Sequence, residues 1–135
     1  VPAMASTHVA IDPPELPASD GYTHVVAVPC ACHKFVFVSG QTVKEGDLGA
    51  QTKAICDNIR VCLARAGAKP TDVTKIGVFV KNYDKSMWPT IRAQLATLFT
   101  ERWPASTLLG VQNLCEPEYL IEIEATAVVV HHHDA

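Results

Sequence analysis

The stretch Tyr119-Leu120-Ile121-Glu122-Ile123-Glu124-Ala125-Thr126-Ala127-Val128-Val129-Val130, YLIEIEATAVVV in one-letter code, decides the fold. Its apolar and polar residues alternate, and successive side chains of a strand point to opposite faces of a sheet. The alternation therefore predicts one long strand over residues 119–130. One face carries Ile121, Ile123, Ala125 and Ala127, which suit helix packing, and the other carries Leu120, Glu122, Glu124 and Thr126.

The segments before this strand predict a mixed sheet. Alternation and turn signals predict strands over 22–28, 34–40, 73–81 and 107–111, the first two forming a hairpin. Apolar residues at helical spacing predict helices over 48–66 and 86–100, with Gly67 just after the first. The order β-β-α-β-α-β-β predicts an α+β fold with both helices on one face of the sheet.

The opposite face of this sheet has no helix left to cover it. A homo-oligomer is the economical cover, because a second copy brings a matching surface. Glu122 and Glu124 would then lie on a face that another subunit approaches. A buried carboxylate there needs hydrogen-bond donors or water, whereas a solvated rim would need neither. Both interpretations stay open at this point.

Size and composition fit one domain over residues 21–130, between an extended Pro-rich arm (1–20) and a tail (131–135). The net charge of −3 gives no field that favours nucleic acid, and no apolar run reaches the ~18 residues that span a bilayer. The five scattered cysteines favour a reducing compartment over a disulfide framework. We therefore expect a cytoplasmic protein without a signal peptide, and neither membrane nor nucleic acid as partner.

Several residues have both a functional and a structural interpretation. Cys30-Ala31-Cys32-His33 resembles part of a metal site, yet it supplies at most three ligands, so an ordinary hairpin turn is favoured and no metal is expected. The run 131–133 of histidines is interpreted as a surface tail. His24 could serve as an acid or base, but a structural histidine is favoured. Nothing marks Cys115, in a turn before Glu116, as activated.

A family resemblance rests on five motifs in a fixed order. They are Phe35-Val36-Phe37-Val38-Ser39-Gly40-Gln41, then Ala50-Gln51-Thr52 with Asp57-Asn58-Ile59 and Ala66-Gly67, then Val78-Phe79-Val80, Pro104-Ala105-Ser106-Thr107 and Ile121-Glu122-Ile123-Glu124-Ala125. Together they resemble the Rid (YjgF) superfamily, formerly called endoribonuclease L-PSP, over about residues 21–130. The resemblance implies a chorismate-mutase-like homotrimer with a central barrel, outer helices and three intersubunit clefts.

The resemblance also implies a chemistry that needs no cofactor. RidA-type members hydrolyse reactive 2-imino acids in the cleft, with a glutamate and backbone groups that position water, and an arginine that holds the substrate carboxylate. Carried over, the glutamate is Glu122, the turn is Ser39, Gly40 and Gln41, and the pocket tyrosine is Tyr22.

The arginine position is where this sequence departs from that pattern. Ser106 occupies it, and the alternative register puts Thr107 there, so neither residue is basic. A buried charge-assisted contact to a carboxylate is worth roughly 2–5 kcal/mol, whereas a neutral hydroxyl donates a bond worth about 1 kcal/mol. The departure argues against efficient 2-imino-acid hydrolysis and favours a neutral or differently charged substrate.

Three hypotheses follow for the function. The first is an enzyme of an arginine-lacking kind that acts on a small enamine, imine or carbonyl metabolite, with Glu122 catalytic and Tyr22, Ser39, Gly40, Ser106 and Thr107 binding substrate. The second is a non-catalytic small-molecule-binding or interaction module on the same trimer. The third, a ribonuclease or translation inhibitor, is disfavoured by the acidic charge. The substrate, and whether Glu124, His24 or Trp103 line the cleft, stay open.

Overall fold

Six strands and two α-helices make up residues 8–131, the part of the chain that the computed structural model describes. In chain order they are β1 (Val9–Ile11), β2 (Val25–Pro29), β3 (His33–Gln41), α1 (Leu48–Arg65), β4 (Val73–Lys81), α2 (Trp88–Leu98), β5 (Ala105–Val111) and β6 (Ile121–Val130). Two short 3-10 turns, Pro70–Asp72 and Lys85–Met87, precede β4 and α2.

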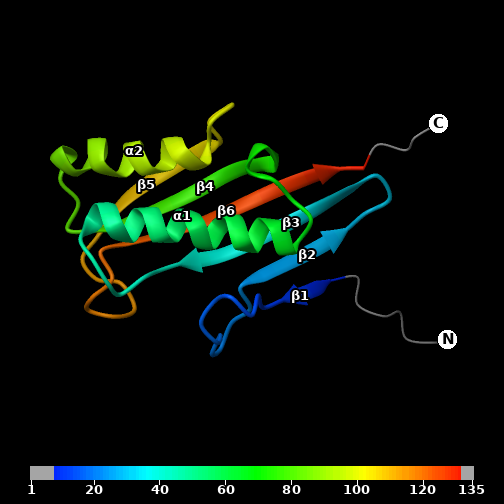
Figure 1. The fold of residues 1–135 in the computed structure, drawn as a ribbon, viewed down its shortest axis with the longest axis horizontal. Coiled ribbons are helices and arrows are strands. Elements are labelled where there is room, and N and C mark those ends of the chain that lie inside the picture. Colours follow the sequence, from blue (N-terminus) through cyan, green and yellow to red (C-terminus); the bar gives the residue numbers. More distant parts are fainter. Residues whose placement is uncertain (1–7, 132–135) are drawn as a thin grey trace.

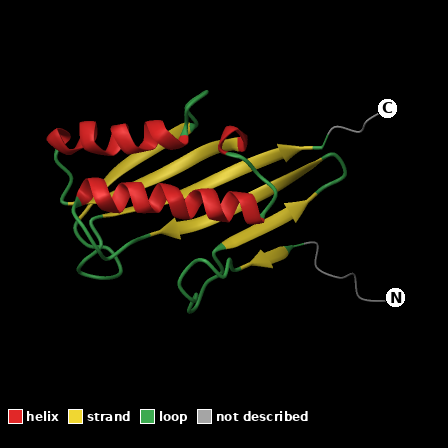
Figure 2. Ribbon diagram, in the orientation of Figure 1, coloured by secondary structure: helices red, strands yellow, loops and turns green. Residues whose placement is uncertain are grey.

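The strands form one sheet in the order β1-β2-β3-β6-β4-β5 (Figure 1). The last strand of the sequence, β6, lies in its middle, antiparallel to both β3 and β4. Only β4 and β5 run parallel, and α2 makes the crossover between them. Both helices lie on the same face of the sheet (Figure 2), so the predicted mixed sheet with two helices on one face is confirmed.

Element boundaries differ from the prediction mostly at chain ends and turns. Residues 9–11 form a short strand, β1, that was not predicted, and Val9 pairs with Ala27 of β2. The first turn of the predicted 86–100 helix is 3-10, and α2 itself ends at Leu98. Strand β5 begins two residues earlier than predicted, at Ala105. The histidine tail beyond residue 131 lies outside the described residues.

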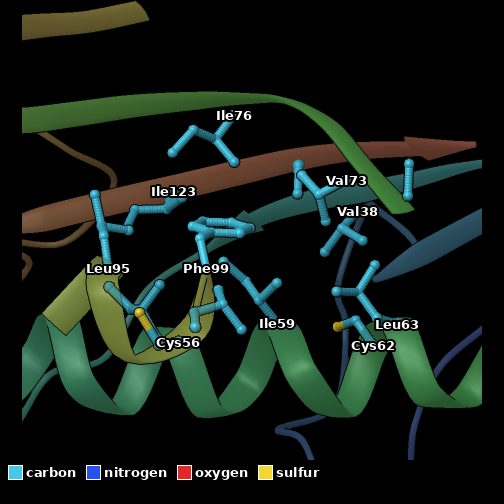
Figure 3. Packing of buried hydrophobic residues seen from close by; sticks show 14 of the residues in the cluster. Val38, Cys56, Ile59, Cys62, Leu63, Val73, Ile76, Leu95, Phe99 and Ile123 are labelled. Atoms are coloured by element: carbon cyan, nitrogen blue, oxygen red, sulfur yellow. The ribbon is translucent and has the colours of Figure 1, made fainter. Parts of the chain in front are cut away.

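The core fills the layer between the helices and the sheet (Figure 3). Ile59 and Leu63 of α1 are fully buried against residues such as Val38, Val73 and Ile123. Each such side chain contributes roughly 1.5–3 kcal/mol of burial free energy. The apolar periodicity of the sequence thus identifies the side of α1 that packs on the sheet.

Two cysteines of α1 belong to the same layer. Cys56 and Cys62 are fully buried, and the Cys56 thiol lies 3.7 Å from the backbone oxygen of Gln94 in α2. Burial raises the pKa of the Cys56 thiol to about 11 and that of the Cys62 thiol to about 12, because desolvation disfavours the thiolate. Both thiols therefore behave as apolar packing groups.

The other face of the sheet carries exposed apolar side chains. Phe37 of β3 is 47% exposed and Leu109 of β5 is 51% exposed. We call this surface the open face; it includes Phe37, Phe79, Leu109, Glu122 and Glu124. Over the described residues 8–131, no helix has the length and apolar character to cross a membrane.

Candidate functional site

A pocket of about 340 Å³ lies where β3 ends and β6 begins. Its lining consists of Tyr22, Ser39, Gly40, Thr42, Cys115, Tyr119 and Glu122. The structure therefore brings Tyr22, Ser39, Gly40 and Glu122 of the predicted set together around one pocket. Thr42, Cys115 and Tyr119 were not predicted to line it.

The Glu122 side chain is placed by strand β6 and by a glycine on the neighbouring strand. Alternation along β6 turns Glu122 away from the helices, and its carboxylate lies over Gly40 of β3. A Cβ on residue 40 would come within 2.1 Å of Glu122 Oε1 and 2.8 Å of its Cδ. Gly40 is thus required by the close approach of the glutamate, where β3 also shifts register between Val38 and Gln41.

Burial shifts the pKa of this carboxyl. Glu122 is half-buried, and desolvation raises the pKa of its carboxyl above the ordinary value, with the negative charge of Glu124 adding to the effect. A carboxyl with a raised pKa holds a proton more readily than a solvated one, so it is better suited to accept and return a proton.

The second carboxylate of β6 leans the opposite way. Glu124 lies over Gly77 of β4, where a Cβ would meet its Oε1 at 2.8 Å. Glu124 does not line the 340 Å³ pocket but a neighbouring hollow of about 260 Å³ that also includes Phe37 and Ser39. The two carboxylates thus diverge from one strand, one toward β3 and the other toward β4.

His24 and Gln41 form a buried hydrogen-bonded support behind the pocket. His24 Nε2 lies 2.9 Å from the Pro17 backbone oxygen, and Gln41 Nε2 lies 3.2 Å from His24 Nδ1. Both ring nitrogens of His24 thus have a hydrogen-bond partner within the fold. The backbone N–H of His24 also donates to Asp12. His24 therefore has the structural role that the sequence analysis favoured.

The same support fixes Ser39 and Tyr22. The Ser39 hydroxyl donates to the Thr23 backbone oxygen at 2.5 Å, so its own oxygen is left to accept from a ligand. The Tyr22 ring packs edge-on against His24, with 5.2 Å between ring centroids. Partial burial raises the pKa of the Tyr22 hydroxyl, and the negative forms of Tyr119 and Asp12 add to this.

Gln51 of α1 holds the loop that supplies Cys115 and Tyr119. Its fully buried side chain donates to the Glu118 backbone oxygen at 3.0 Å and to the Gly46 oxygen at 3.2 Å. Its Oε1 accepts from the Leu120 N–H at 2.9 Å. One amide thereby joins the start of α1 to the residues that enter β6, and so determines where the pocket wall lies.

Ser106 and Thr107 lie outside this pocket within one chain. They belong to β5, which β4 separates from β6, so they lie two strand spacings, roughly 10 Å, across the sheet from Glu122 and are also offset along the strands by two to three residues. Thr107 pairs with Gly77 on the open face and accepts a hydrogen bond from Lys75 Nζ at 2.8 Å. Ser106 pairs with Ile76, whose side chain is buried under the helices, so it lies on the helix-covered face.

Other candidate groups also lie elsewhere. The Trp103 ring packs against Phe99, and the Arg92 guanidinium carbon lies 5.5 Å from the centroid of the Trp103 ring. Arg102 donates to the Thr71 backbone oxygen beside a separate hollow of about 250 Å³.

Cys32 Sγ lies 3.3 Å from His33 Nδ1 in the hairpin turn. Within residues 8–131, no group of three or more His, Cys, Asp or Glu side chains is arranged to hold a metal.

Fold and site together define a class of small α+β proteins. In this class both helices cover one face of the sheet, and a pocket that contains a carboxylate lies beside the open face. The chain belongs to the family described as Endoribonuclease L-PSP, whose model matches residues 14–129. This confirms the superfamily to which the sequence motifs pointed.

Named relatives of the chain include two deaminases. The chain is 33% identical over 102 residues to the 3-aminoacrylate deaminase RutC of Acinetobacter baylyi, covering 70% of this chain and 79% of that protein. It is 36% identical over 85 residues to the 2-iminobutanoate/2-iminopropanoate deaminase of Escherichia coli, covering 61% and 64%. The crystal structure of the E. coli YjgF gene product superposes with a TM-score of 0.75 at 30% identity, covering 89% of this chain and 98% of that one.

Proposed function

We propose that this protein hydrolyses a small enamine or imine in the Glu122 pocket without a cofactor. The observation that carries the proposal is the half-buried Glu122 carboxyl, which lies over Gly40 in the wall of the pocket. The names of the two relatives, both deaminases of imines or enamines, support the same reaction class.

The chemistry assigns a proton-transfer role to Glu122. Ionised Glu122 accepts a proton from a water molecule as the water oxygen bonds to the carbon of the protonated imine, and the electron pair of the C=N bond moves to nitrogen. The resulting carbinolamine takes that proton from Glu122 at nitrogen. The C–N bond then breaks to release ammonia, the hydroxyl oxygen forms the C=O bond of the carbonyl product, and the hydroxyl proton passes to Glu122 and from there to the ammonia. An enamine first takes a proton on carbon to become the imine. The raised pKa of Glu122 supports both directions of transfer.

We further propose that the protein forms a homotrimer in which a second subunit completes the pocket, and that it is located in the cytoplasm. The exposed Phe37 and Leu109 of the open face support an interface there. The five free cysteines fit a reducing compartment. In such a trimer β5 of one subunit would meet the pocket of the next, with Thr107 of the open face as a contact in place of an arginine. Ser106 lies on the opposite face of β5.

Ammonia release from a panel of imines and enamines tests the reaction. Glu122→Gln is expected to lower turnover by roughly 10²- to 10⁴-fold, the usual contribution of a general acid or base. Glu101→Gln, beside the separate hollow, is the matched control and should leave turnover unchanged. No turnover by the wild type on any member of the panel would leave the non-catalytic binding module as the better hypothesis.

A further inference from the structure

The turn between β2 and β3 carries two thiols that the proposed hydrolysis does not use. Cys30 and Cys32 lie in this turn, and both are exposed. The structure confirms the hairpin turn expected from the sequence, because the Cys30 N–H donates to the His33 backbone oxygen at 2.7 Å, just beyond the ladder pair of Pro29 and Lys34. This bond closes the turn, so the two cysteines are held at the tip of the hairpin.

The turn lies at the opposite end of β3 and β6 from the Glu122 pocket. The pocket forms where β3 ends and β6 begins, whereas His33 at the start of β3 pairs with Val130 at the end of β6. Beyond that pair, the His131 N–H donates to the Cys32 backbone oxygen at 2.9 Å. Figure 1 shows the turn at the end of the sheet where β6 finishes. The two thiols therefore belong to an end of the sheet, away from the pocket that a second subunit is proposed to complete.

The spacing of the two cysteines permits a disulfide between them. Cα atoms two positions apart in a turn lie roughly 5–6 Å from each other, because consecutive Cα atoms are about 3.8 Å apart and the chain bends between them. Disulfide-bonded cysteines have Cα atoms about 4.4–6.8 Å apart. Cys30 and Cys32 meet this requirement, whereas Cys115, the other exposed cysteine, has no second cysteine near it in the sequence.

An imidazole lies at hydrogen-bond distance from one of the two thiols. Cys32 Sγ is 3.3 Å from His33 Nδ1. The His33 ring packs edge-on against Phe35, with 5.2 Å between ring centroids, and the His33 backbone oxygen accepts the bond that closes the turn. An imidazole that takes the proton of an adjacent thiol generates the thiolate, which is the nucleophilic form. These contacts single out Cys32 as the reacting thiol, with Cys30 two positions away.

Metal binding does not account for this cluster. Cys30, Cys32 and His33 would supply at most three ligands, and across residues 8–131 no three His, Cys, Asp or Glu side chains are arranged to hold a metal. Cysteines that respond to oxidants are accessible to solvent and often lie next to a second, resolving cysteine. The turn has both features.

From these observations we propose that the β2–β3 turn is a site of reversible thiol oxidation by hydroperoxides. The site is separate from the Glu122 pocket, so the proposal goes beyond the proposed hydrolysis and does not depend on it. In the first step His33 takes the thiol proton of Cys32, and the thiolate attacks the terminal oxygen of the hydroperoxide. The S–O bond forms, the O–O bond breaks, and water or an alcohol leaves with the proton from His33.

The second step converts the resulting sulfenic acid of Cys32 into a disulfide. The Cys30 sulfur attacks the Cys32 sulfur, the S–S bond forms as the S–O bond breaks, and the hydroxide leaves as water with the thiol proton of Cys30. Two thiols thus lose two electrons in total, and one hydroperoxide gains them. In a reducing compartment, thiol–disulfide exchange with cellular thiols returns the pair to its reduced form.

Counting free thiols on the full-length protein tests the oxidation. The reduced protein receives one equivalent of hydrogen peroxide, is denatured and alkylated with N-ethylmaleimide, and is weighed by intact-mass spectrometry. We expect the labels to fall from five to three, since two of the five thiols join, with Cys115 still labelled. The peptide that contains residues 30–32 should be lighter by two hydrogen atoms, and dithiothreitol should restore all five labels.

Three outcomes of this count would overturn the proposal. They are five labels throughout, as would follow if a neighbouring subunit covered the turn, oxidation of Cys115 as fast as that of Cys32, and a disulfide that joins two molecules.

Variants assign the role of each group. Cys30→Ser should stop at the sulfenic acid, which dimedone traps on Cys32, whereas Cys32→Ser should give no dimedone adduct in the turn. His33→Gln should slow the oxidation about tenfold or more, because it removes the proton acceptor. The matched control His131→Gln keeps the backbone N–H that donates to Cys32 and should keep the wild-type rate. A His33→Gln variant that is folded by circular dichroism and reacts as fast as the wild type would contradict the proposal.

Discussion

The Glu122 carboxylate occupies the volume that a side chain on residue 40 would fill. The same relation repeats one strand further along, where Glu124 lies over Gly77. A glycine in a strand interior ordinarily weakens the strand, so its presence beside a glutamate indicates a close approach that the fold uses. At the scale of single residues, each carboxylate of β6 thus depends on a glycine in a neighbouring strand.

Substituting these two glycines separates their roles. Gly40→Ala is expected to force the Glu122 carboxylate out of its position, since the new methyl group would lie within 3.0 Å of three of its atoms. Ammonia release should fall by about tenfold or more, in keeping with the sensitivity of catalysis to small displacements. Gly77→Ala displaces Glu124 in the same manner outside the pocket and serves as the matched control. Equal losses in both variants would contradict the assignment of the pocket to Glu122.

The raised pKa of Glu122 predicts a pH-dependent difference in stability. Between the ordinary value of 4.5 and the raised folded value, the folded state holds a proton that the unfolded chain has released. Stability therefore falls as pH rises through this window, and the loss persists above it. Glu122→Gln removes the ionisation, so its melting temperature should exceed that of the wild type at pH 7.5. The excess should shrink toward pH 4; an excess of the same size at both pH values would refute this account.

At the scale of elements, one side chain connects α1 to the loop before β6. Gln51 makes its contacts with backbone groups of two separate loops from a fully buried position. A buried amide with backbone partners is costly to remove, because the partners stay buried and lose their hydrogen bonds. The position of Tyr119 and Cys115 in the pocket wall depends on this connection.

Replacing Gln51 tests the connection. Gln51→Leu is expected to lower the free energy of unfolding by about 2–4 kcal/mol, because several backbone groups would lose their partner. Thr52→Val, which removes only the bond to the Leu48 oxygen within α1, should cost about 1 kcal/mol or less. Chemical denaturation measures both. A Gln51 variant as stable as the Thr52 variant would show that the loop holds itself in place.

Sequence reasoning succeeded for elements with long periodic patterns. Strand β4 spans the predicted residues, and α1 ends one residue before the predicted boundary. It missed β1 because three residues in a proline-rich segment are too few to show alternation, and their pairing with β2 is a long-range contact. Among pocket residues, Tyr22, Ser39, Gly40 and Glu122 came from motifs, whereas Cys115 and Tyr119 lie in a loop positioned by Gln51, a contact without a periodic signal.

At the scale of the whole molecule, the open face leaves large apolar side chains in solvent. Phe37 and Leu109 are about half exposed, from strands on either side of the central β6. Exposed apolar area on a regular sheet is the usual mark of an interface between subunits. The homotrimer proposed above would remove this area from water while leaving both helices outside.

A charge on the open face should prevent this assembly. We expect Leu109→Asp to elute at the monomer mass in size-exclusion chromatography with light scattering, where the wild type elutes at three times that mass, because the interface would bury an unpaired carboxylate. Ala93→Asp, on the exposed side of α2, is the control and should leave the mass unchanged. A wild-type protein that elutes as a monomer would refute the proposed trimer.

The two buried thiols of α1 can report on local opening of the core. Cys30, Cys32 and Cys115 are exposed, and a maleimide pulse should label them within seconds, whereas Cys56 and Cys62 are buried in the core between α1 and the sheet. A thiol whose pKa is about 11 or 12 reacts only after its surroundings open. The slow labelling of these two cysteines, counted by intact-mass spectrometry, would therefore time how often the helical layer lifts from the sheet.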